Sequence, residues 1–210
     1  MDKGFAIFDM DGTLVDSMGY WTHLGEEFLR RKGRDDLPAD LWDRLKTKTM
    51  PQCAEYFIRH FGLAGTAAGL EEEMNAVMAE HYRRDVPLKP GAGEYLAALA
   101  RRGVDMCVAT NTPAPLVRAC LGRLGVLDLF RFCISGEEVG AGKDRPDIYL
   151  AAAKGLGGRP GDTAVYEDAL FALRTAKMAG FYAVGVYDRE NGQDWDQICR
   201  LADETVLDWD

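Results

Sequence analysis

The hydrophobic positions of this 210-residue chain form two kinds of pattern. One is a short apolar run without alternation, which is typical of a strand covered on both faces in a parallel sheet. Such runs occur at residues 5–8, 104–109, 132–135, 163–166 and 182–186, with a short edge strand expected at 205–206. The other is helical spacing, which fills the intervals at residues 93–102, 113–124, 146–154, 169–179 and 195–201. Strands interleaved with helices predict an α/β fold with a parallel sheet flanked by helices.

Downstream of the first apolar run, a long stretch shows helical spacing and no strand pattern. Its apolar residues fall into four groups, around residues 21–29, 41–45, 54–61 and 70–84. Pro87 and Pro90 then prevent a helix from continuing. The sequence therefore predicts a small all-helical domain, residues 16–86, inserted into an α/β core domain made of residues 1–15 and 87–210.

The composition limits which binding partners and which cellular compartment are expected. A hydrophobic content of 47% is enough for one well-buried core, or for a core with a small accessory unit. The formal net charge of -9 argues against nucleic acid or an anionic membrane surface as a partner. The five cysteines lack C-x-x-C spacing and are expected to be reduced core residues. Because no apolar stretch approaches about 20 residues and the first residues do not resemble a secretory signal, we expect a cytoplasmic protein. As a separate expectation, the chain is a monomer or a weak homodimer.

The first apolar run ends in two carboxylates. Asp9 follows it directly, Asp11 comes two positions later, and Gly12 ends the extended conformation. Ligands of parallel sheets bind beyond the carboxyl ends of the strands, and two carboxylates in a cleft are costly unless a cation or a proton offsets their repulsion. The pair therefore predicts a metal site, an acid/base role, or both. A hairpin turn at Gly12 is the alternative, but the residues after Thr13 do not alternate as a returning strand should. An EF-hand loop is rejected because Leu14 and Tyr20 stand where it needs Gly and Glu.

Three further polar groups follow apolar runs or lie in loops between them. Thr110 and Asn111 end a run just before a helix, which suits a phosphoryl oxygen and equally suits a helix cap. Lys143 lies in a glycine-rich loop that lacks the pattern of a nucleotide-binding P-loop, and by itself it is a weak signal. Glu167 and Asp168 close another strand, although adjacent acids are common on surfaces.

The coincidence of these groups carries more weight than any one of them. In a parallel sheet the carboxyl ends of the strands share one edge, so the polar residues that follow them converge. Carboxylates from separate strand ends make a hard oxygen site suited to Mg²⁺, with Lys143 as the balancing cation. The converging residues are Asp9, Asp11, Thr110, Asn111, Glu167 and Asp168.

The sequence Phe-Asp-Met-Asp-Gly-Thr-Leu at residues 8–14 resembles the first motif of the haloacid dehalogenase-like (HAD) superfamily. Most members of that superfamily are phosphatases and phosphotransferases, and the order and spacing of the other three groups match its remaining motifs. The resemblance spans the whole chain and implies a Rossmann-like core and a Mg²⁺-dependent phosphoric monoester hydrolase. It also implies roles for individual residues: Asp9 as the nucleophile that forms an aspartyl phosphate, Asp11 as general acid and base, Thr110, Asn111 and Lys143 as phosphate ligands, and Asp9, Asp11, Glu167 and Asp168 as the metal site.

The helical insertion after the first motif resembles the small α-helical cap of the beta-phosphoglucomutase-like branch. By that likeness, cap residues select a small phosphorylated metabolite, and the candidates are Tyr20, Trp21, Lys46 and Lys48. A packed Trp21 and solvated lysines are the alternative. Mutases of this branch carry His where this chain has Trp21, and residues 110–113 look like the phosphatase version of the second motif, so a phosphatase is expected. A sugar-phosphate mutase and a non-catalytic phosphate-binding regulatory protein are the two alternatives.

Overall fold

The computed structural model describes residues 3–45 and 48–209. The chain divides into two compact units, one helical and one α/β, and the chain passes between them twice. The helical unit is Met18–Asp85, and the α/β unit combines Met1–Ser17 with Val86–Asp210. None of the helices in the described residues is long and apolar enough to cross a membrane.

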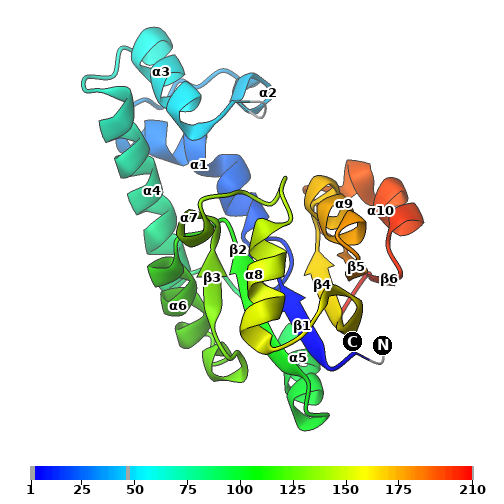
Figure 1. Cartoon of the computed structure of the whole chain (residues 1–210). Helices are drawn as coiled ribbons and strands as arrows, with labels where there is room; N and C mark the ends of the chain where they lie inside the picture. Colours follow the sequence, from blue (N-terminus) through cyan, green and yellow to red (C-terminus); the bar gives the residue numbers. More distant parts are fainter. Residues whose placement is uncertain (1–2, 46–47, 210) are drawn as a thin grey trace. The chain divides into compact units, whose positions relative to one another are not determined.

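The α/β unit is built on a single sheet of six parallel strands in the order β3-β2-β1-β4-β5-β6 (Figure 1). This confirms the predicted α/β fold. The first strand of the sequence lies in the interior of the sheet, so its neighbours are strands that come about 100 and 160 residues later. The strands are β1 (Phe5–Phe8), β2 (Asp105–Thr110), β3 (Cys133–Ser135), β4 (Thr163–Glu167), β5 (Tyr182–Val186) and β6 (Glu204–Val206).

Side chains of β1 are buried on both faces of the sheet, as its unbroken apolar run predicts. On one face Ile7 packs with residues of β2, β4 and α8, including the buried Tyr149. On the other face Phe8 stacks on Tyr166 with 4.2 Å between ring centroids, and Tyr95 of α5 meets the edge of the same ring. The sheet is thus fixed from both sides, which holds the ends of its strands in place.

The helices of the α/β unit follow the predicted intervals, with one addition. The short α7 was not predicted, and it forms because Ser135 and Glu138 make a reciprocal capping box directly after β3. It ends at Val139, and its C-cap Gly140 lies three residues before Lys143. The helices are α5 (Ala92–Arg101), α6 (Ala114–Arg123), α7 (Gly136–Val139), α8 (Asp147–Leu156), α9 (Leu170–Met178) and α10 (Trp195–Leu201).

The helical unit has four helices among its described residues, in the four places where apolar residues recur. The last of them begins three residues earlier than predicted, because the Thr66 hydroxyl caps it by accepting a hydrogen bond of 3.1 Å from the Gly69 amide. Phe28, Phe57 and Met74 are buried between the helices. The helices are α1 (Met18–Arg31), α2 (Leu41–Leu45), α3 (Met50–Phe61) and α4 (Ala67–Arg84).

Candidate active site

Three acidic side chains come together where β1 and β4 end. These strands are adjacent and parallel, and their registers pair Phe8 with Tyr166. Asp9 follows β1, Glu167 is the last residue of β4 and Asp168 follows it, so the three lie at the same edge of the sheet. All three are buried, and each offers a carboxylate oxygen within 4.8 Å of the others.

Lys143 reaches this cluster from the loop between α7 and α8. Its Nζ donates hydrogen bonds to Oδ1 of Asp9 and, at 2.6 Å, to Oε1 of Glu167. The lysine is only 4% exposed, so the solvated side chain that its glycine-rich loop also allowed is not what the structure contains. Lys143 is an internal counter-charge held between two strand ends.

The electrostatics of the cluster reflect burial and like charges. Burial raises the pKa of Asp9 well above its ordinary value, the charge of Lys143 lowers it in part, and the charges of Glu167 and Asp168 raise it further. Burial and the neighbouring Glu167 raise the pKa of Asp168 to about 7. Burial alone lowers the pKa of Lys143, but Asp9 and Glu167 outweigh it, and the net shift is upward. The cluster therefore has more negative charge than one lysine offsets, which favours a bound cation.

Both oxygens of Asp168 are held by hydrogen bonds from other segments. The Thr13 hydroxyl donates to Oδ1 at 3.0 Å, and the amide of Asn191 donates to Oδ2 at 2.5 Å. Asn191 lies in the loop after β5, where Asp188 forms an ion pair of 2.9 Å with Lys89. Hydrogen bonds of this kind orient a carboxylate that binds a metal.

Asp11 is held by two hydroxyl groups. The Ser17 hydroxyl donates to Oδ1 at 2.6 Å, and the Thr112 hydroxyl donates to Oδ2 at 2.7 Å. Ser17 and Thr112 are both buried, whereas Asp11 is partly exposed. The structure thus places Asp11 after β1 and ties it to the segment after β2.

Thr110 and Asn111 lie at the end of β2, the neighbour of β1 on the side away from β4. Thr110 is buried, and its hydroxyl oxygen accepts a hydrogen bond of 3.1 Å from the Thr112 amide, which leaves its own hydrogen able to donate to a ligand. Asn111 is exposed, and its side-chain oxygen is so close to Gly136 that a Cβ there would approach it to 2.8 Å. Neither side chain acts as the cap of α6, because the cap position is Pro113.

The candidates in the helical unit have partners within that unit. The ring of Tyr20 lies against His81, and the Trp21 indole donates a hydrogen bond of 3.1 Å to the Tyr82 hydroxyl. Trp21 also lines a cavity of about 220 Å³ together with the exposed Lys48, whose ammonium lies over a tyrosine ring. Lys46 lies outside the described residues.

Tyr149 is a buried residue of α8 that the sequence did not single out. Its hydroxyl donates a hydrogen bond of 2.6 Å to the Glu167 oxygen that also accepts from Lys143. Tyr149→Phe is expected to lower the free energy of unfolding by about 1–3 kcal/mol, because a hydrogen bond to a buried charge is lost. Urea denaturation at pH 7 measures this.

The matched control is Tyr182→Phe. That hydroxyl bonds Glu204 at 3.3 Å near the surface, so the loss is expected to stay below about 0.5 kcal/mol. Equal losses in the two variants would contradict a structural role of Tyr149 at the cluster.

The residues that the sequence missed differ in how they could have been found. Asp188 and Asn191 lie in the loop that begins where β5 ends, so the rule that ligands bind beyond strand ends would have indicated them. Thr13, Ser17 and Tyr149 act by donating hydrogen bonds to acids already identified. A hydroxyl within a loop or an apolar helix carries no signal of such a partner.

Comparison with known proteins identifies the same family that the sequence motif at residues 8–14 resembles. The family model described as haloacid dehalogenase-like hydrolase matches residues 5–180. The beta-phosphoglucomutase of Bacillus subtilis (strain 168) is 29% identical over 97% of this chain and 92% of its own length. The validoxylamine A 7'-phosphate phosphatase of Streptomyces hygroscopicus subsp. limoneus is 30% identical over 97% of this chain and 95% of its own length.

A solved structure also resembles the chain over its whole length. The crystal structure of CbbY from Rhodobacter sphaeroides in complex with phosphate superimposes with a TM-score of 0.75 at 25% identity, covering 99% of this chain and 95% of the other. The matched family model spans most of the chain, including β1, β2 and β4 with the polar residues at their carboxyl ends. This chain is therefore an enzyme of the haloacid dehalogenase-like hydrolase family.

Proposed function

We propose that this chain is a Mg²⁺-dependent phosphatase that hydrolyses a small phosphorylated metabolite through an aspartyl phosphate on Asp9. One observation carries the proposal: Asp9 accepts a hydrogen bond from Lys143 inside a buried cluster with Glu167 and Asp168. The similarity to a curated phosphatase over nearly the full length supports the same reaction class.

The residues of the cluster fit a small divalent cation. Asp9, Glu167 and Asp168 offer three carboxylate oxygens within 4.8 Å of one another, and such oxygens are the ligands that Mg²⁺ prefers. Burial and the excess of carboxylates over the single ammonium of Lys143 raise the pKa of Asp168, and a cation would relieve the repulsion between the carboxylates. When bound, Mg²⁺ would offset the repulsion between a carboxylate nucleophile and a phosphate dianion.

Asp9 carries out the first step. A carboxylate is nucleophilic at neutral pH without a general base, so an oxygen of Asp9 attacks phosphorus while the bond from phosphorus to the leaving oxygen breaks. The ammonium of Lys143, next to Asp9, holds the transferred group and offsets its charge, and the hydroxyl of Thr110 donates to a phosphoryl oxygen. Alignment and charge stabilisation of this kind are the main requirements of phosphoryl transfer.

Asp11 moves the protons. In its protonated form it donates to the departing alkoxide, and as a carboxylate it then accepts a proton from the water that attacks the aspartyl phosphate, releasing phosphate and restoring Asp9. The hydroxyls of Ser17 and Thr112 bond both of its oxygens. Because a hydroxyl both donates and accepts, these two residues accommodate either protonation state of Asp11.

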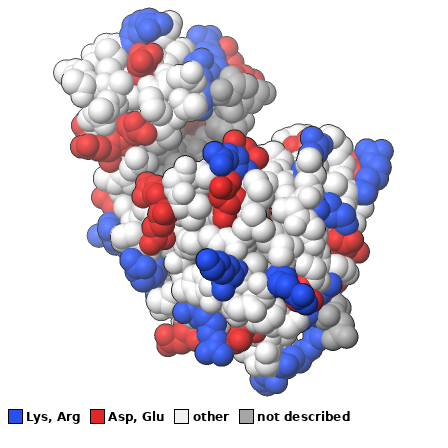
Figure 2. All heavy atoms as spheres, in the orientation of Figure 1, with Lys and Arg blue, Asp and Glu red and all other residues white. Residues whose placement is uncertain are grey.

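The substrate class is a small anion. On the face drawn in Figure 2, Lys and Arg side chains are scattered among Asp and Glu side chains, and the whole chain has a net charge of -9. A surface of this kind disfavours polyanionic partners. A single phosphate group is instead served by the buried Lys143. The helical unit is assigned the role of a cap that selects the rest of the substrate, through candidates such as Tyr20, Trp21 and Lys48.

A sugar-phosphate mutase is the second candidate, favoured by the similarity to the beta-phosphoglucomutase of Bacillus subtilis. The two reactions share the aspartyl phosphate and differ in whether water or a second substrate hydroxyl accepts the phosphoryl group. Trp21 stands where the mutases of this branch carry His, which favours water as the acceptor.

The test is a panel of phosphorylated metabolites together with p-nitrophenyl phosphate, assayed with Mg²⁺ and with excess EDTA. We expect release of inorganic phosphate that EDTA abolishes and added Mg²⁺ restores. Conversion of a sugar phosphate to an isomer without phosphate release, followed by ³¹P NMR, would establish the mutase instead. Phosphate binding by calorimetry without turnover of any panel member would identify a non-catalytic binding protein.

A further inference from the structure

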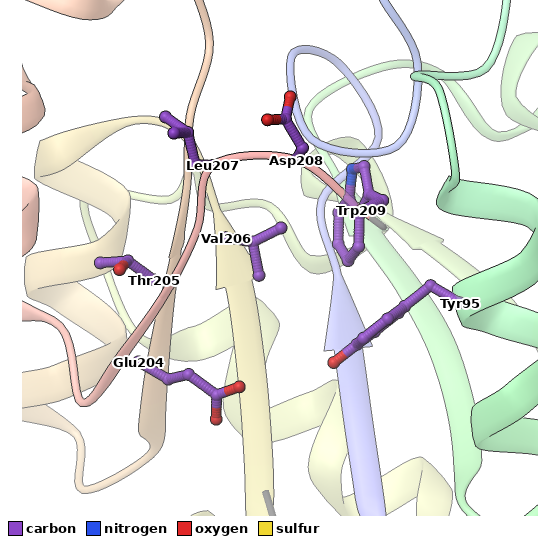
Figure 3. A pocket seen from close by; sticks show the side chains of 7 residues that line it. All are labelled: Tyr95, Glu204, Thr205, Val206, Leu207, Asp208 and Trp209. Carbon is purple, nitrogen blue, oxygen red and sulfur yellow. The ribbon is translucent and has the colours of Figure 1, made fainter.

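The segment after β6 packs against the sheet face on which Phe8 and Tyr166 lie. It lines a cavity of about 400 Å³ with Tyr95 of α5 (Figure 3). Trp209 is only 4% exposed, and its ring centroid lies 4.8 Å from that of Tyr95, 5.8 Å from Tyr166 and 6.2 Å from Phe8. Trp209 therefore belongs to an aromatic cluster with Phe8, Tyr95 and Tyr166 on this face of the sheet.

The start of α5 is shaped to admit this tryptophan. Gly91 precedes α5 with a φ of 79°, and a Cβ at this position would lie 2.9 Å from the carbonyl carbon of Trp209. Any other residue at Gly91 would be strained by its backbone and would also collide with Trp209. The close approach of the two segments holds the backbone of Trp209 in one place.

From this position Trp209 reaches the loop that follows β1. Its indole Nε1 donates a hydrogen bond of 3.3 Å to the carbonyl oxygen of Thr13, and Figure 3 shows the indole nitrogen facing that loop. The hydroxyl of the same Thr13 donates to Oδ1 of Asp168 at 3.0 Å. One residue thus receives a hydrogen bond from Trp209 through its backbone and gives one to Asp168 through its side chain.

We propose that Trp209 is a positioning residue for the metal site: it fixes the Thr13 peptide so that the Thr13 hydroxyl orients the Asp168 carboxylate. The proposal rests on the proposed function, in which Asp168 binds Mg²⁺. Residues that orient metal ligands in this way typically change metal affinity or activity by about 10–100-fold when they are lost. Trp209 acts one residue further away, so a smaller effect is expected.

The test is Trp209→Phe, which keeps an aromatic ring in the cluster and removes the N–H group. We expect the Mg²⁺ dissociation constant, measured by calorimetry without substrate, to rise about 3–10-fold. Turnover at low Mg²⁺ should fall by the same factor, and saturating Mg²⁺ should restore kcat to within about twofold of the wild-type value. Recovery of kcat at saturating Mg²⁺ distinguishes a weakened metal site from a general loss of folded structure.

The matched control is Tyr95→Phe, which removes the 2.7 Å hydrogen bond between Tyr95 and Tyr166 in the same aromatic cluster. It is expected to lower Tm and to leave Mg²⁺ affinity at the wild-type value. Equal weakening of Mg²⁺ binding by both variants would show that loosening of the cluster is the cause, and it would overturn the proposal.

Thr13→Val provides a second, independent measurement, and it also serves if Trp209→Phe does not fold. It should weaken Mg²⁺ binding at least as much as Trp209→Phe, and the two changes together should be no worse than Thr13→Val alone. Wild-type affinity in Thr13→Val, or in Trp209→Phe, overturns the inference while the proposed function stands. Absence of any Mg²⁺ binding by the wild-type protein would overturn both.

Discussion

Replacing Asp9 with asparagine is expected to lower phosphate release by at least about 10³-fold, because the amide keeps the shape of the side chain and cannot form an aspartyl phosphate. The loss should be similar for p-nitrophenyl phosphate and for an alkyl phosphate, since every substrate needs the same nucleophile. Steady-state kinetics at saturating Mg²⁺ measure it. The matched control is Asp16→Asn, which makes the same change at an exposed carboxylate and should retain wild-type activity.

The stability of the Asp9→Asn variant distinguishes loss of chemistry from loss of the fold. Burial and the charges of Glu167 and Asp168 raise the pKa of Asp9 well above its ordinary value, so the ionised side chain destabilises the metal-free protein. An uncharged asparagine removes that repulsion, and Tm in EDTA at pH 8 should equal or exceed the wild-type value. Residual turnover above about a tenth of wild type would contradict the role assigned to Asp9, and a marked fall in Tm would attribute the lost activity to the fold instead.

The fold was easier to predict from the sequence than the contacts within the site. The unbroken apolar run at residues 5–8 requires cover on both faces, and the structure supplies it with α8 on one side and aromatic residues on the other. Acids after such strands then converge because parallel strands share one carboxyl edge. Asp9, Glu167 and Asp168 meet for this reason, and no detail of side-chain packing was needed to predict it.

What the sequence could not supply is the set of hydrogen bonds that orient these acids, directly or through Thr13. Tyr149 donates to Glu167, Thr13 donates to Asp168, and Trp209 donates to the carbonyl oxygen of Thr13. Each of these contacts joins residues 18 or more positions apart, and each depends on the angle at which a helix or loop meets the sheet. Periodicity along the chain reports which face of an element is buried but not which atom a hydroxyl or amide will reach.

Asp11→Asn is expected to separate two kinds of substrate. With an alkyl phosphate, the departing alkoxide needs a proton, so formation of the aspartyl phosphate should slow by about 10²- to 10⁴-fold. With p-nitrophenyl phosphate the leaving group departs without a proton, so this step should persist. Hydrolysis of the aspartyl phosphate still needs Asp11 as a base. Rapid mixing should therefore show one equivalent of p-nitrophenol released as a burst, followed by slow turnover.

Ser17→Ala is the control for Asp11→Asn, because it removes one of the two hydroxyl groups that bond Asp11 and retains the carboxylate. Its loss of turnover should be about tenfold or less, with no burst, since both proton transfers remain possible and only their geometry is loosened. If Asp11→Asn slowed both substrates equally and gave no burst, Asp11 would be holding the loop after β1 and not moving protons. The leaving oxygen would then have to obtain its proton from water, and hydrolysis of alkyl phosphates by the wild-type protein would be correspondingly slow.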